Sequence, residues 1–514
     1  MSFKYDAVVI GAGNGGLTAA VRLAQGGAKT LLVEKHNLPG GFATSFRRGR
    51  FEFEASLHEL NDFGTADNAG DVRQLFDSLG VTDKIEWFLI PDAYRVICKS
   101  EGLDATMPFG VKAFIERMEQ YVPGSRKSTE KFFALAEEVR LAQAYSNSVN
   151  GKTDSKYMVE NYGNFVRCGS YSVNEVLRTL KMPQKAQDIL SAYWCYLGAH
   201  LEDMSFAHYA SMVNRYILRG AVSPKSRSHE ISLAMIERFL ELGGEVHMNT
   251  EAVRIPTDKD GVEGVMLADG TAIETRHVVA NCSPHLVYGK MMDDVPERII
   301  RATNARKLSG RGFTLFLGLD ATAEEMGVQN HNYFLYDTSD SVRQYHLMET
   351  IEDNDVQATV CLNRAQPDCS PEGTCMMYFT TLFMQREDGA DAWSEITPEN
   401  YVKTKNKVAD RMIERFEHDT GARIRDHIEE IAIATPMTYA RYCGHPQGTI
   451  YGYESQYWDG LMPRLQMMSE DYANGVRGLR FAGGYAMRLS GYSSAYHAGD
   501  ISGRQTLGDL KREG

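Results

Sequence analysis

The chain lacks the segments and motifs that mark several large protein classes. No stretch of about 18 consecutive apolar residues is present, so no membrane-spanning helix is predicted. The first residues have no basic leader and no cleavage site, so no secretory signal is expected. HExxH, GxSxG and P-loop motifs do not occur, and no internal repeat is visible. These absences argue against a zincin, a GxSxG hydrolase, a P-loop NTPase and a solenoid protein.

Paired cysteines and excess positive charge are also missing. The eight cysteines are scattered without a CxxC pair, which is typical of a reducing compartment and predicts no zinc or other metal site. The formal net charge is −13, from 55 Lys and Arg against 68 Asp and Glu, and it would repel a nucleic acid. We expect a cytoplasmic protein without a nucleic-acid partner. The sequence leaves peripheral contact with a membrane open.

What the sequence does contain is a dinucleotide-binding pattern near its start. Residues 7–10 form a short buried-strand run, residues 11–16 (GAGNGG) fit GxGxxG, and residues 17–25 are expected to form a helix. A second strand is predicted at residues 30–33. Strand, loop, helix and strand follow in the order of a βαβ nucleotide-binding unit.

The loop residues each match a physical requirement of phosphate binding. Gly11 permits the tight turn, Gly13 lets the backbone approach a pyrophosphate, and Gly16 allows the helix to pack closely on the strand. Glu34 ends the second strand about 20 residues further on, where a carboxylate accepts hydrogen bonds from ribose hydroxyls. The sequence has one such fingerprint, so electrons are expected to come from the substrate, another protein or a transiently bound donor. The fingerprint alone leaves NAD and FAD open.

Beyond this unit, helical and strand-rich stretches follow one another. Helical periods dominate from residue 72 to 219, and alternation returns at residues 245–284 with three or four predicted strands. Segments 277–280 and 478–481 are predicted to be strands of the nucleotide sheet. We therefore expect an α/β fold in which a Rossmann-like domain, formed by residues 1–95, 220–310 and 445–514, is interleaved with an α+β substrate-binding domain, formed by residues 96–219 and 311–444.

Three segments resemble the phytoene desaturase, carotenoid isomerase and retinol saturase family of FAD-dependent oxidoreductases, which lies in the amine-oxidase superfamily. They are GGFATSFRRGRFEFEASLHEL at residues 40–60, the strand-rich stretch 243–284, and ATPMTYARYCGHPQGTIYGYE at residues 434–454. The resemblance covers roughly residues 5–505. The first and third segments are more similar to the isomerase and saturase branch. The resemblance implies FAD as the cofactor.

The resemblance also implies where FAD is held. In this superfamily a GG doublet after the acidic residue marks FAD rather than NAD, and the C-terminal helix that opens at Gly491 aims its positive end at the flavin. The implied cofactor-binding residues are Gly11, Gly13, Gly16, Glu34, Lys35, Gly40, Gly41, Thr44, Val253, Gly483, Gly484, Gly491, Tyr492 and Ser493. Two positions depart from the family pattern, since Phe42 and Gly484 stand where relatives often carry arginine and aspartate.

Chemistry at a carbon–carbon double bond needs a proton partner beside the flavin. His58 and Glu59 are the first candidates, because the histidine could titrate near neutrality while the carboxylate orients it. Tyr492, Tyr496 and His497 of the C-terminal helix are second candidates, and the two tyrosines share one face of that helix. For each of these residues, hydrogen bonding or packing within the fold is the alternative interpretation.

Candidate substrate contacts lie in the predicted substrate domain and in a basic stretch. His200 lies at the start of a loop that the resemblance assigns to the substrate domain. The basic stretch could bind a substrate carboxylate, although a solvated patch or contact with anionic lipid explains it as well. Its members are Arg215, Arg219, Lys225, Arg227 and His229, and among them Arg227 and His229 are the predicted substrate residues.

The sequence thus predicts a FAD enzyme that saturates, desaturates or isomerises a double bond of an apolar polyene, unsaturated fatty acid or enone. A flavin amine oxidase is the first alternative, because it shares the superfamily fold. The second alternative is a prenyl-lipid carrier of the GDP-dissociation-inhibitor type, which has the fold without the flavin. The intact Gly11, Gly13, Gly16 and Glu34 weigh against the carrier.

Overall fold

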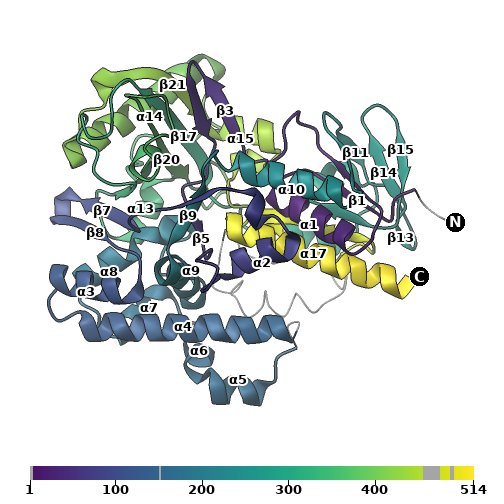
Figure 1. Ribbon diagram of the computed structural model, residues 1–514, viewed down its shortest axis with the longest axis horizontal. Helices are drawn as coiled ribbons and strands as arrows, with labels where there is room; N and C mark the ends of the chain where they lie inside the picture. Colours follow the sequence, from purple (N-terminus) through teal and green to yellow (C-terminus); the bar gives the residue numbers. More distant parts are fainter. Residues whose placement is uncertain (1–3, 150–151, 455–474, 487–490, 514) are drawn as a thin grey trace.

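The computed structural model describes residues 4–149, 152–454, 475–486 and 491–513. A five-stranded parallel sheet and a seven-stranded mixed sheet lie side by side, and a group of helices lies below the seven-stranded sheet in the view of Figure 1. The N-terminal and C-terminal ends are both on the side of the parallel sheet. The predicted α/β fold with a Rossmann-like sheet is confirmed.

The parallel sheet has the strand order β10–β2–β1–β16–β22. Strands β1, β2 and β16 are buried at every position, as expected for parallel strands that helices cover on both faces. The predicted return of the later segments to this sheet is confirmed, because β16 pairs with both β1 and β22. The bounds are β1 (Ala7–Ile10), β2 (Thr30–Val33), β10 (Glu245–His247), β16 (Val278–Ala280) and β22 (Leu479–Phe481).

Helices α1 (Asn14–Gln25), α10 (His229–Glu241) and α17 (Tyr492–Glu513) pack around this sheet (Figure 1). Helix α1 begins three residues before the predicted start at residue 17, with Gly13 at its N-cap. Helices α1 and α17 approach at backbone distance, since a Cβ atom on Gly499 would lie 2.1 Å from the carbonyl oxygen of Gly15. The N-termini of two helices are thereby brought together.

The mixed sheet has the order β21–β17–β20–β19–β18–β7–β8. Its two longest strands, β17 and β20, pair antiparallel along nine residues each, and Thr314 lies directly opposite Thr380. Helix α14 (Pro398–Thr420) packs Phe416 against Tyr333 and Phe379 of the sheet. The bounds are β7 (Tyr94–Cys98), β8 (Leu103–Met107), β17 (Arg311–Leu319), β18 (Asn332–Leu335), β19 (Gln357–Cys361), β20 (Cys375–Phe383) and β21 (Ile428–Ala434).

The predicted helical region between residues 72 and 219 is confirmed. One of its helices, α8, continues into a 3-10 helix over Ser191–Tyr196 that carries Tyr196 toward the sheets. The bounds are α2 (Asp71–Leu79), α3 (Val111–Tyr121), α4 (Arg126–Ser148), α5 (Ser155–Asn161), α6 (Gly163–Cys168), α7 (Val173–Thr179), α8 (Gln184–Leu190) and α9 (Phe206–Arg219). Later helices are α11 (Pro284–Leu286), α12 (Glu297–Asn304), α13 (Ser341–Leu347) and α15 (Pro436–Cys443).

The stretch 245–284 has more strands than predicted. Its first and last strands, β10 and β16, belong to the parallel sheet, and five further short strands form a three-stranded sheet and a hairpin, where three or four strands in total were expected. These five are β11 (Ala252–Arg254), β12 (Thr257–Asp258), β13 (Gly261–Val262), β14 (Gly264–Leu267) and β15 (Ala272–Glu274). Other small sheets use β3 (Ser45–Arg48), β4 (Phe51–Glu54), β5 (Leu60–Asn61), β6 (Trp87–Leu89) and β9 (Ala221–Pro224).

The strands of the parallel sheet come from separate parts of the chain, with the mixed sheet and the helices inserted between them. The domain boundaries given above stay a prediction, and parts of the ranges 1–95, 96–219 and 445–514 lie outside the described residues. Within the described ranges, no helix combines the length and the apolar character needed to cross a membrane.

Candidate functional site

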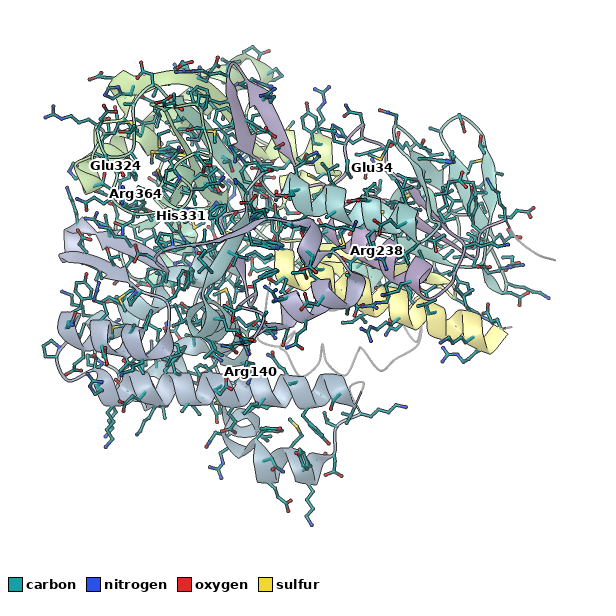
Figure 2. All side chains as sticks on the ribbon, in the orientation of Figure 1. Glu34, Arg140, Arg238, Glu324, His331 and Arg364 are labelled. Atoms are coloured by element: carbon teal, nitrogen blue, oxygen red, sulfur yellow. The ribbon has the colours of Figure 1, made fainter. Side chains whose placement is uncertain are left out.

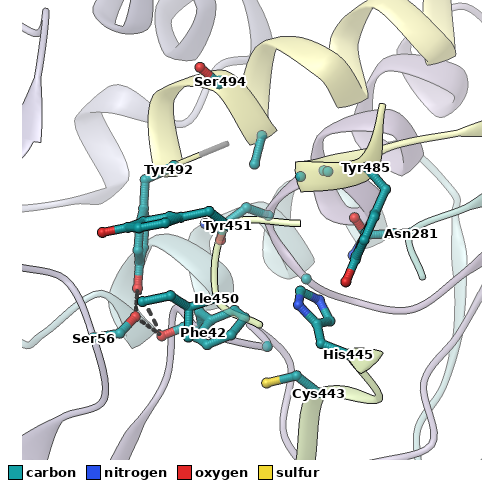
Figure 3. Close-up of a pocket in the computed structure, with 18 of the residues that line it drawn as sticks. Phe42, Ser56, Asn281, Cys443, His445, Ile450, Tyr451, Tyr485, Tyr492 and Ser494 are labelled. Atoms are coloured by element: carbon teal, nitrogen blue, oxygen red, sulfur yellow. Dashed lines mark hydrogen bonds between the residues drawn. The ribbon is translucent and has the colours of Figure 1, made fainter. Parts of the chain in front are cut away.

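A cavity of about 410 Å³ has walls from both large sheets. One end is lined by the loop after β1, by Glu34 after β2 and by the first turn of α17. Further along, the walls include Thr314 of β17 and Thr380 of β20. Figure 3 shows part of the wall, in which Phe42, Tyr451, Tyr485 and His445 lie around the cavity.

The glycine loop leaves backbone exposed to this cavity. Gly11 has φ +94°, and a Cβ atom on Gly15 would lie 2.3 Å from the backbone nitrogen of Gly483. Gly13 is the N-cap of α1 and supplies no side-chain cap, so the first N–H groups of α1 keep their hydrogen-bonding capacity. Gly11, Gly13, Asn14 and Gly15 line the cavity. Gly16 does not, and a Cβ atom there would lie 2.0 Å from the Gly11 carbonyl oxygen, which fits its predicted packing role.

Glu34 and Lys35 line the cavity where β2 ends. The Glu34 carboxylate accepts hydrogen bonds from the Ala12 amide at 2.7 Å and from the His36 amide at 2.8 Å. These two bonds hold it beside the glycine loop (labelled in Figure 2), and its further lone pairs can accept from ribose hydroxyls. The predicted acceptor is therefore in place.

The GG doublet after β2 folds back onto the glycine loop. The Gly40 amide donates to the Ala12 carbonyl oxygen at 2.7 Å, and Gly40 and Gly41 have φ values of +119° and +61°. Both line the cavity, and the Gly41 Cβ position is 3.4 Å from Gly13 Cα. Thr44 does not line it, and among the described residues its buried hydroxyl has no hydrogen-bond partner.

The C-terminal segment completes this end of the cavity. Gly483, Gly484 and Gly491 line it, together with Ser493 in the first turn of α17. The N-termini of α1 and α17 therefore both face the same space, and each carries a partial positive charge. Val253 lies outside the lining with its side chain partly exposed, whereas its neighbour Ala252 lines the cavity, as expected where side chains alternate along a strand.

These features fit a bound dinucleotide. The glycine cradle would be filled by any Cβ atom on Gly15, the carboxylate of Glu34 offers acceptors for a ribose, and two helix N-termini favour a pyrophosphate. Within the described ranges, no group of three or more His, Cys, Asp or Glu side chains is placed to hold a metal ion.

His58 and Glu59 line the cavity beside the mixed sheet, but their predicted relation is wrong. Burial, with a smaller contribution from His331 (labelled in Figure 2), lowers the pKa of His58 to about 3, so the imidazole is neutral at physiological pH. Glu59 accepts from Asn332 Nδ2 at 3.5 Å rather than binding the histidine. Its other oxygen is buried without a partner among the described residues, and burial raises the pKa of Glu59 well above its usual value. Burial therefore favours the neutral form of this carboxyl.

Replacing Glu59 by glutamine is expected to raise the thermal midpoint, and to raise it more at pH 8 than at pH 5. Because the pKa of Glu59 is raised in the folded protein, its contribution to stability is full below the unfolded pKa and is lost as pH rises. Between the pKa of the carboxyl in the unfolded chain and its raised pKa in the folded protein, each pH unit lowers the free energy of unfolding by about 1.4 kcal/mol. Thermal melts of Glu59→Gln and wild type from pH 5 to pH 8 measure the difference. A difference that does not change with pH would contradict a neutral buried acid.

The two tyrosines of the C-terminal helix are placed differently from each other. Tyr492 lines the cavity, but its hydroxyl donates to the Phe42 carbonyl oxygen at 2.8 Å and lies 2.9 Å from Ser56 Oγ (dashed lines in Figure 3). Tyr496 is fully buried outside the lining, with its ring edge-on to Phe76 at 4.9 Å. Tyr496 is therefore a packing residue, which corrects its predicted catalytic role.

The predicted substrate residues His200, Arg227 and His229 all lie outside the cavity lining. His200 contacts Asp203, and burial lowers the pKa of His229. The Arg227 guanidinium donates to the backbone carbonyl oxygens of Glu52, Lys225 and Cys369, so it ties three segments together.

The rest of the basic stretch is compensated by acidic partners. Arg215 does line the cavity, but it forms ion pairs with Asp62 at 2.7 Å and with Asp71 at 3.2 Å. Arg219 pairs with the same Asp62 at 3.0 Å, and Lys225 pairs with Glu86. The prediction that this stretch binds a substrate carboxylate is not supported, because its charges are already paired within the fold.

Sequence reasoning missed several polar residues of the site. His445 lies in the cavity wall (Figure 3), and its Nδ1 lies 2.8 Å from the Thr449 carbonyl oxygen. Nδ1 therefore carries the proton and donates this bond, while Nε2 is the unprotonated nitrogen; burial lowers the pKa of His445 to about 4. Tyr196 and Tyr439 were also missed, because their elements join the site only through the tertiary fold.

Aromatic and aliphatic side chains make up much of the remaining wall. Phe42 stacks on Tyr439 with ring centroids 5.5 Å apart, so the position where relatives often carry arginine is apolar here. Other apolar and aromatic lining residues are Leu57, Leu197, Met212, Tyr216, Ile450 and Tyr451. This aromatic and aliphatic part of the wall fits an apolar ligand.

Comparisons with known proteins agree with this geometry. Residues 9–79 match the family described as an NAD(P)-binding Rossmann-like domain. The chain is 25% identical over 477 residues to an all-trans-retinol 13,14-reductase from Danio rerio, covering 87% of this chain and 77% of that protein. It is 23% identical over 481 residues to a chloroplastic prolycopene isomerase from Daucus carota, covering 88% and 72%.

A solved structure shares the fold. The cyclohexylamine oxidase from Brevibacterium oxydans has a TM-score of 0.62 at 14% identity, covering 99% of this chain and 100% of that one. The predicted resemblance is confirmed: over most of its length the chain is homologous to the retinol saturase and carotenoid isomerase group.

Proposed function

We propose that this homologue of the retinol saturases and carotenoid isomerases is a FAD-dependent enzyme acting on a carbon–carbon double bond of an apolar polyene. The observation that carries the proposal is one cavity that joins a dinucleotide cradle to an aromatic compartment. The names of two relatives, a retinol reductase and a prolycopene isomerase, support a polyene as the substrate class. Saturation, desaturation and isomerisation are all compatible with this site.

The residues of the cavity have distinct parts in the proposal. The loop at Gly13 and Gly15 and the two helix N-termini would hold the pyrophosphate, and Glu34 would hold a ribose. FAD, when bound, supplies the hydride chemistry. The aromatic wall binds the apolar chain and excludes water, and the buried polar groups at His58 and Glu59 supply a place for proton exchange.

The proposal is tested by purifying the protein, releasing any cofactor by denaturation and identifying it. We expect FAD near one equivalent per chain. The holoenzyme, reduced anaerobically, is then mixed with all-trans-retinol, prolycopene, unsaturated fatty acids and enones, and the flavin absorption and the products are followed. Reoxidation with a saturated product, or isomerisation without net electron transfer, supports the proposal. A protein without flavin contradicts it.

The same preparation separates the alternatives. An amine oxidase would be reoxidised by oxygen after reduction by an amine and would release hydrogen peroxide. A prenyl-lipid carrier would bind an isoprenoid without any flavin absorption. The glycine loop, Glu34 and two helix N-termini around one cavity favour a cofactor-binding protein over the carrier, because together they offer donors for a pyrophosphate and acceptors for a ribose.

A further inference from the structure

Five polar side chains form a continuous hydrogen-bonded chain along the cavity wall, and we call it the hydroxyl–imidazole chain. The Tyr196 hydroxyl lies 3.4 Å from His58 Nδ1, and His58 Nε2 lies 3.5 Å from Thr380 Oγ1. Thr380 Oγ1 lies 3.2 Å from Thr314 Oγ1, which accepts from the Tyr439 hydroxyl at 2.8 Å. All five residues line the cavity. A polar track thus crosses a wall that is otherwise largely apolar.

The fold holds each link of the chain on a different element. Thr314 and Thr380 face each other because they are direct cross-strand partners in β17 and β20. Tyr196 ends the 3-10 helix after α8, His58 follows β4, and Tyr439 lies in α15. Such a track requires two strands of the mixed sheet, the segment after β4 and two helical segments in register, which explains why no local sequence pattern indicates it.

The chemical state of the chain suits proton transfer. Burial raises the pKa of the Tyr196 hydroxyl well above its usual value, so this hydroxyl is protonated, and its oxygen accepts from Asn332 Nδ2 at 3.2 Å. His58 is neutral because burial lowers its pKa to about 3. A neutral imidazole has one N–H group and one bare nitrogen, so it can accept a proton at one side while it gives one up at the other.

The two tautomers of His58 correspond to two directions in which the hydrogen bonds of the chain can be donated. With the proton on Nδ1, His58 donates to the Tyr196 oxygen and accepts from Thr380, which leaves the Tyr196 O–H free to point into the cavity. With the proton on Nε2, His58 donates to Thr380 and accepts from Tyr196. Moving every proton of the chain by one position, with one proton leaving from Tyr196 and one entering at Tyr439, converts the first arrangement into the second.

We propose that Tyr196 is the residue that protonates the substrate carbon, and that the hydroxyl–imidazole chain replaces the proton it gives away. The Tyr196 O–H bond breaks and a C–H bond forms, using the electron pair that the carbon carries after its neighbour has received a hydride from a reduced flavin. In the same step His58 Nδ1 gives its proton to the Tyr196 oxygen, Thr380 gives one to His58 Nε2, Thr314 gives one to Thr380, and Tyr439 gives one to Thr314. Tyr196 is the catalytic residue here, and His58 and Thr380 are positioning residues that act through it.

The far end of the chain lies one helical turn from an exposed residue of the cavity wall. Tyr442 lines the cavity and is 56% exposed, and it follows Tyr439 by one turn of α15. Water that enters there can restore the proton taken from Tyr439 between turnovers.

The inference rests on the proposed function, and Tyr196→Phe tests it. The measurement is a single turnover in D₂O of the anaerobically reduced holoenzyme with the polyene that the wild type converts. We expect Tyr196→Phe to keep flavin and polyene binding and to lose about 100- to 1,000-fold in rate, the contribution of general acid catalysis. Tyr209→Phe is the matched control, since Tyr209 lies outside the lining and donates to the Leu190 carbonyl oxygen. It should keep the wild-type rate.

A second variant tests the chain rather than the tyrosine. Thr380→Val keeps the shape of the side chain but removes the hydroxyl between Thr314 and His58. We expect a plot of the wild-type rate against the deuterium fraction of the solvent to be curved, because several protons move in the rate-limiting step. The same plot for Thr380→Val should be a straight line. A merely structural role of Thr380 would lower the rate without changing the shape of this dependence.

The rates of the two variants and the flavin content of the wild type each have a result that would overturn a different part of the inference. A Tyr196→Phe enzyme that keeps more than about a third of the wild-type rate overturns Tyr196 as the proton donor. Suppose that the wild type binds FAD and converts a polyene, but Thr380→Val shows the same curved deuterium dependence as the wild type. That result overturns the relay, while the proposed function stands. If the wild type binds no flavin or converts no polyene, the proposed function itself fails, and the inference fails with it.

Discussion

Replacing Gly15 by alanine is expected to weaken flavin binding by roughly 100-fold. The new Cβ atom would lie 2.3 Å from the backbone nitrogen and 2.8 Å from the Cα of Gly483, so one of two backbone segments must move. Overpacking of this kind costs about 3 kcal/mol, and about 1.4 kcal/mol corresponds to a tenfold change in affinity. Because both segments line the cofactor end of the cavity, we expect the cost to appear in binding.

The flavin content after purification and the dissociation constant on reconstitution measure this effect. Gly508→Ala is the matched control, because Gly508 lies within α17 and nothing is within 4 Å of its Cβ position. That variant should bind flavin as the wild type does and melt at the same or a slightly higher temperature. Full flavin content in Gly15→Ala would show that the cofactor does not lie against this loop.

Replacing Glu54 by alanine is expected to destabilise the protein by at least about 4 kcal/mol. The buried Glu54 carboxylate accepts from the Ser228 amide at 2.7 Å and the Ser228 hydroxyl at 2.6 Å. It also accepts from the amides of Ser56 and Leu57 at 3.2 Å and 3.1 Å. The substitution leaves four donors without this acceptor, and each buried orphan costs about 1–3 kcal/mol.

The same substitution should also disturb the cavity. Glu54 fixes the turn that presents Ser56, Leu57 and His58 to it, so we expect lost flavin along with a lower thermal midpoint. The control is Glu52→Ala, which removes a half-buried carboxylate of the same strand whose oxygen accepts from Ser45 Oγ at 2.6 Å. Its expected cost is about 1 kcal/mol. Equal melting temperatures of the two variants would contradict the role assigned to Glu54.

The cofactor end of the site was predictable from the sequence for a physical reason. Gly11, Gly13, Glu34 and the strands around them form one contiguous βαβ unit, in which local residue types determine the geometry. The two distant strands of the same sheet were also predictable, because short apolar runs bounded by turn residues are typical of buried parallel strands. The α1 start was missed by three residues because Gly13 can cap a helix as well as form a loop.

The reactive end was not predictable in the same way. His58 is an ordinary candidate base by residue type, but its burial makes it neutral, and burial depends on the mixed sheet packed against it. Arg215 is a possible carboxylate ligand by residue type, but in the fold it forms an ion pair with Asp62. Tyr196 could be recognised only once the 3-10 helix after α8 was placed against β18, where it contacts Asn332 and Phe334. Charge compensation and desolvation are properties of the tertiary structure.

The central claim is that this cavity joins a flavin to an apolar polyene. Its most direct test is anaerobic reduction of the bound flavin followed by rapid mixing with all-trans-retinol or prolycopene, with the flavin absorption and the product recorded together. We predict that the polyene either reoxidises the flavin and gains two hydrogens, or isomerises while the flavin stays reduced. A protein that purifies without flavin would contradict the account. So would a reduced flavin that no polyene reoxidises or uses for isomerisation, if amines are found to reduce the oxidised enzyme.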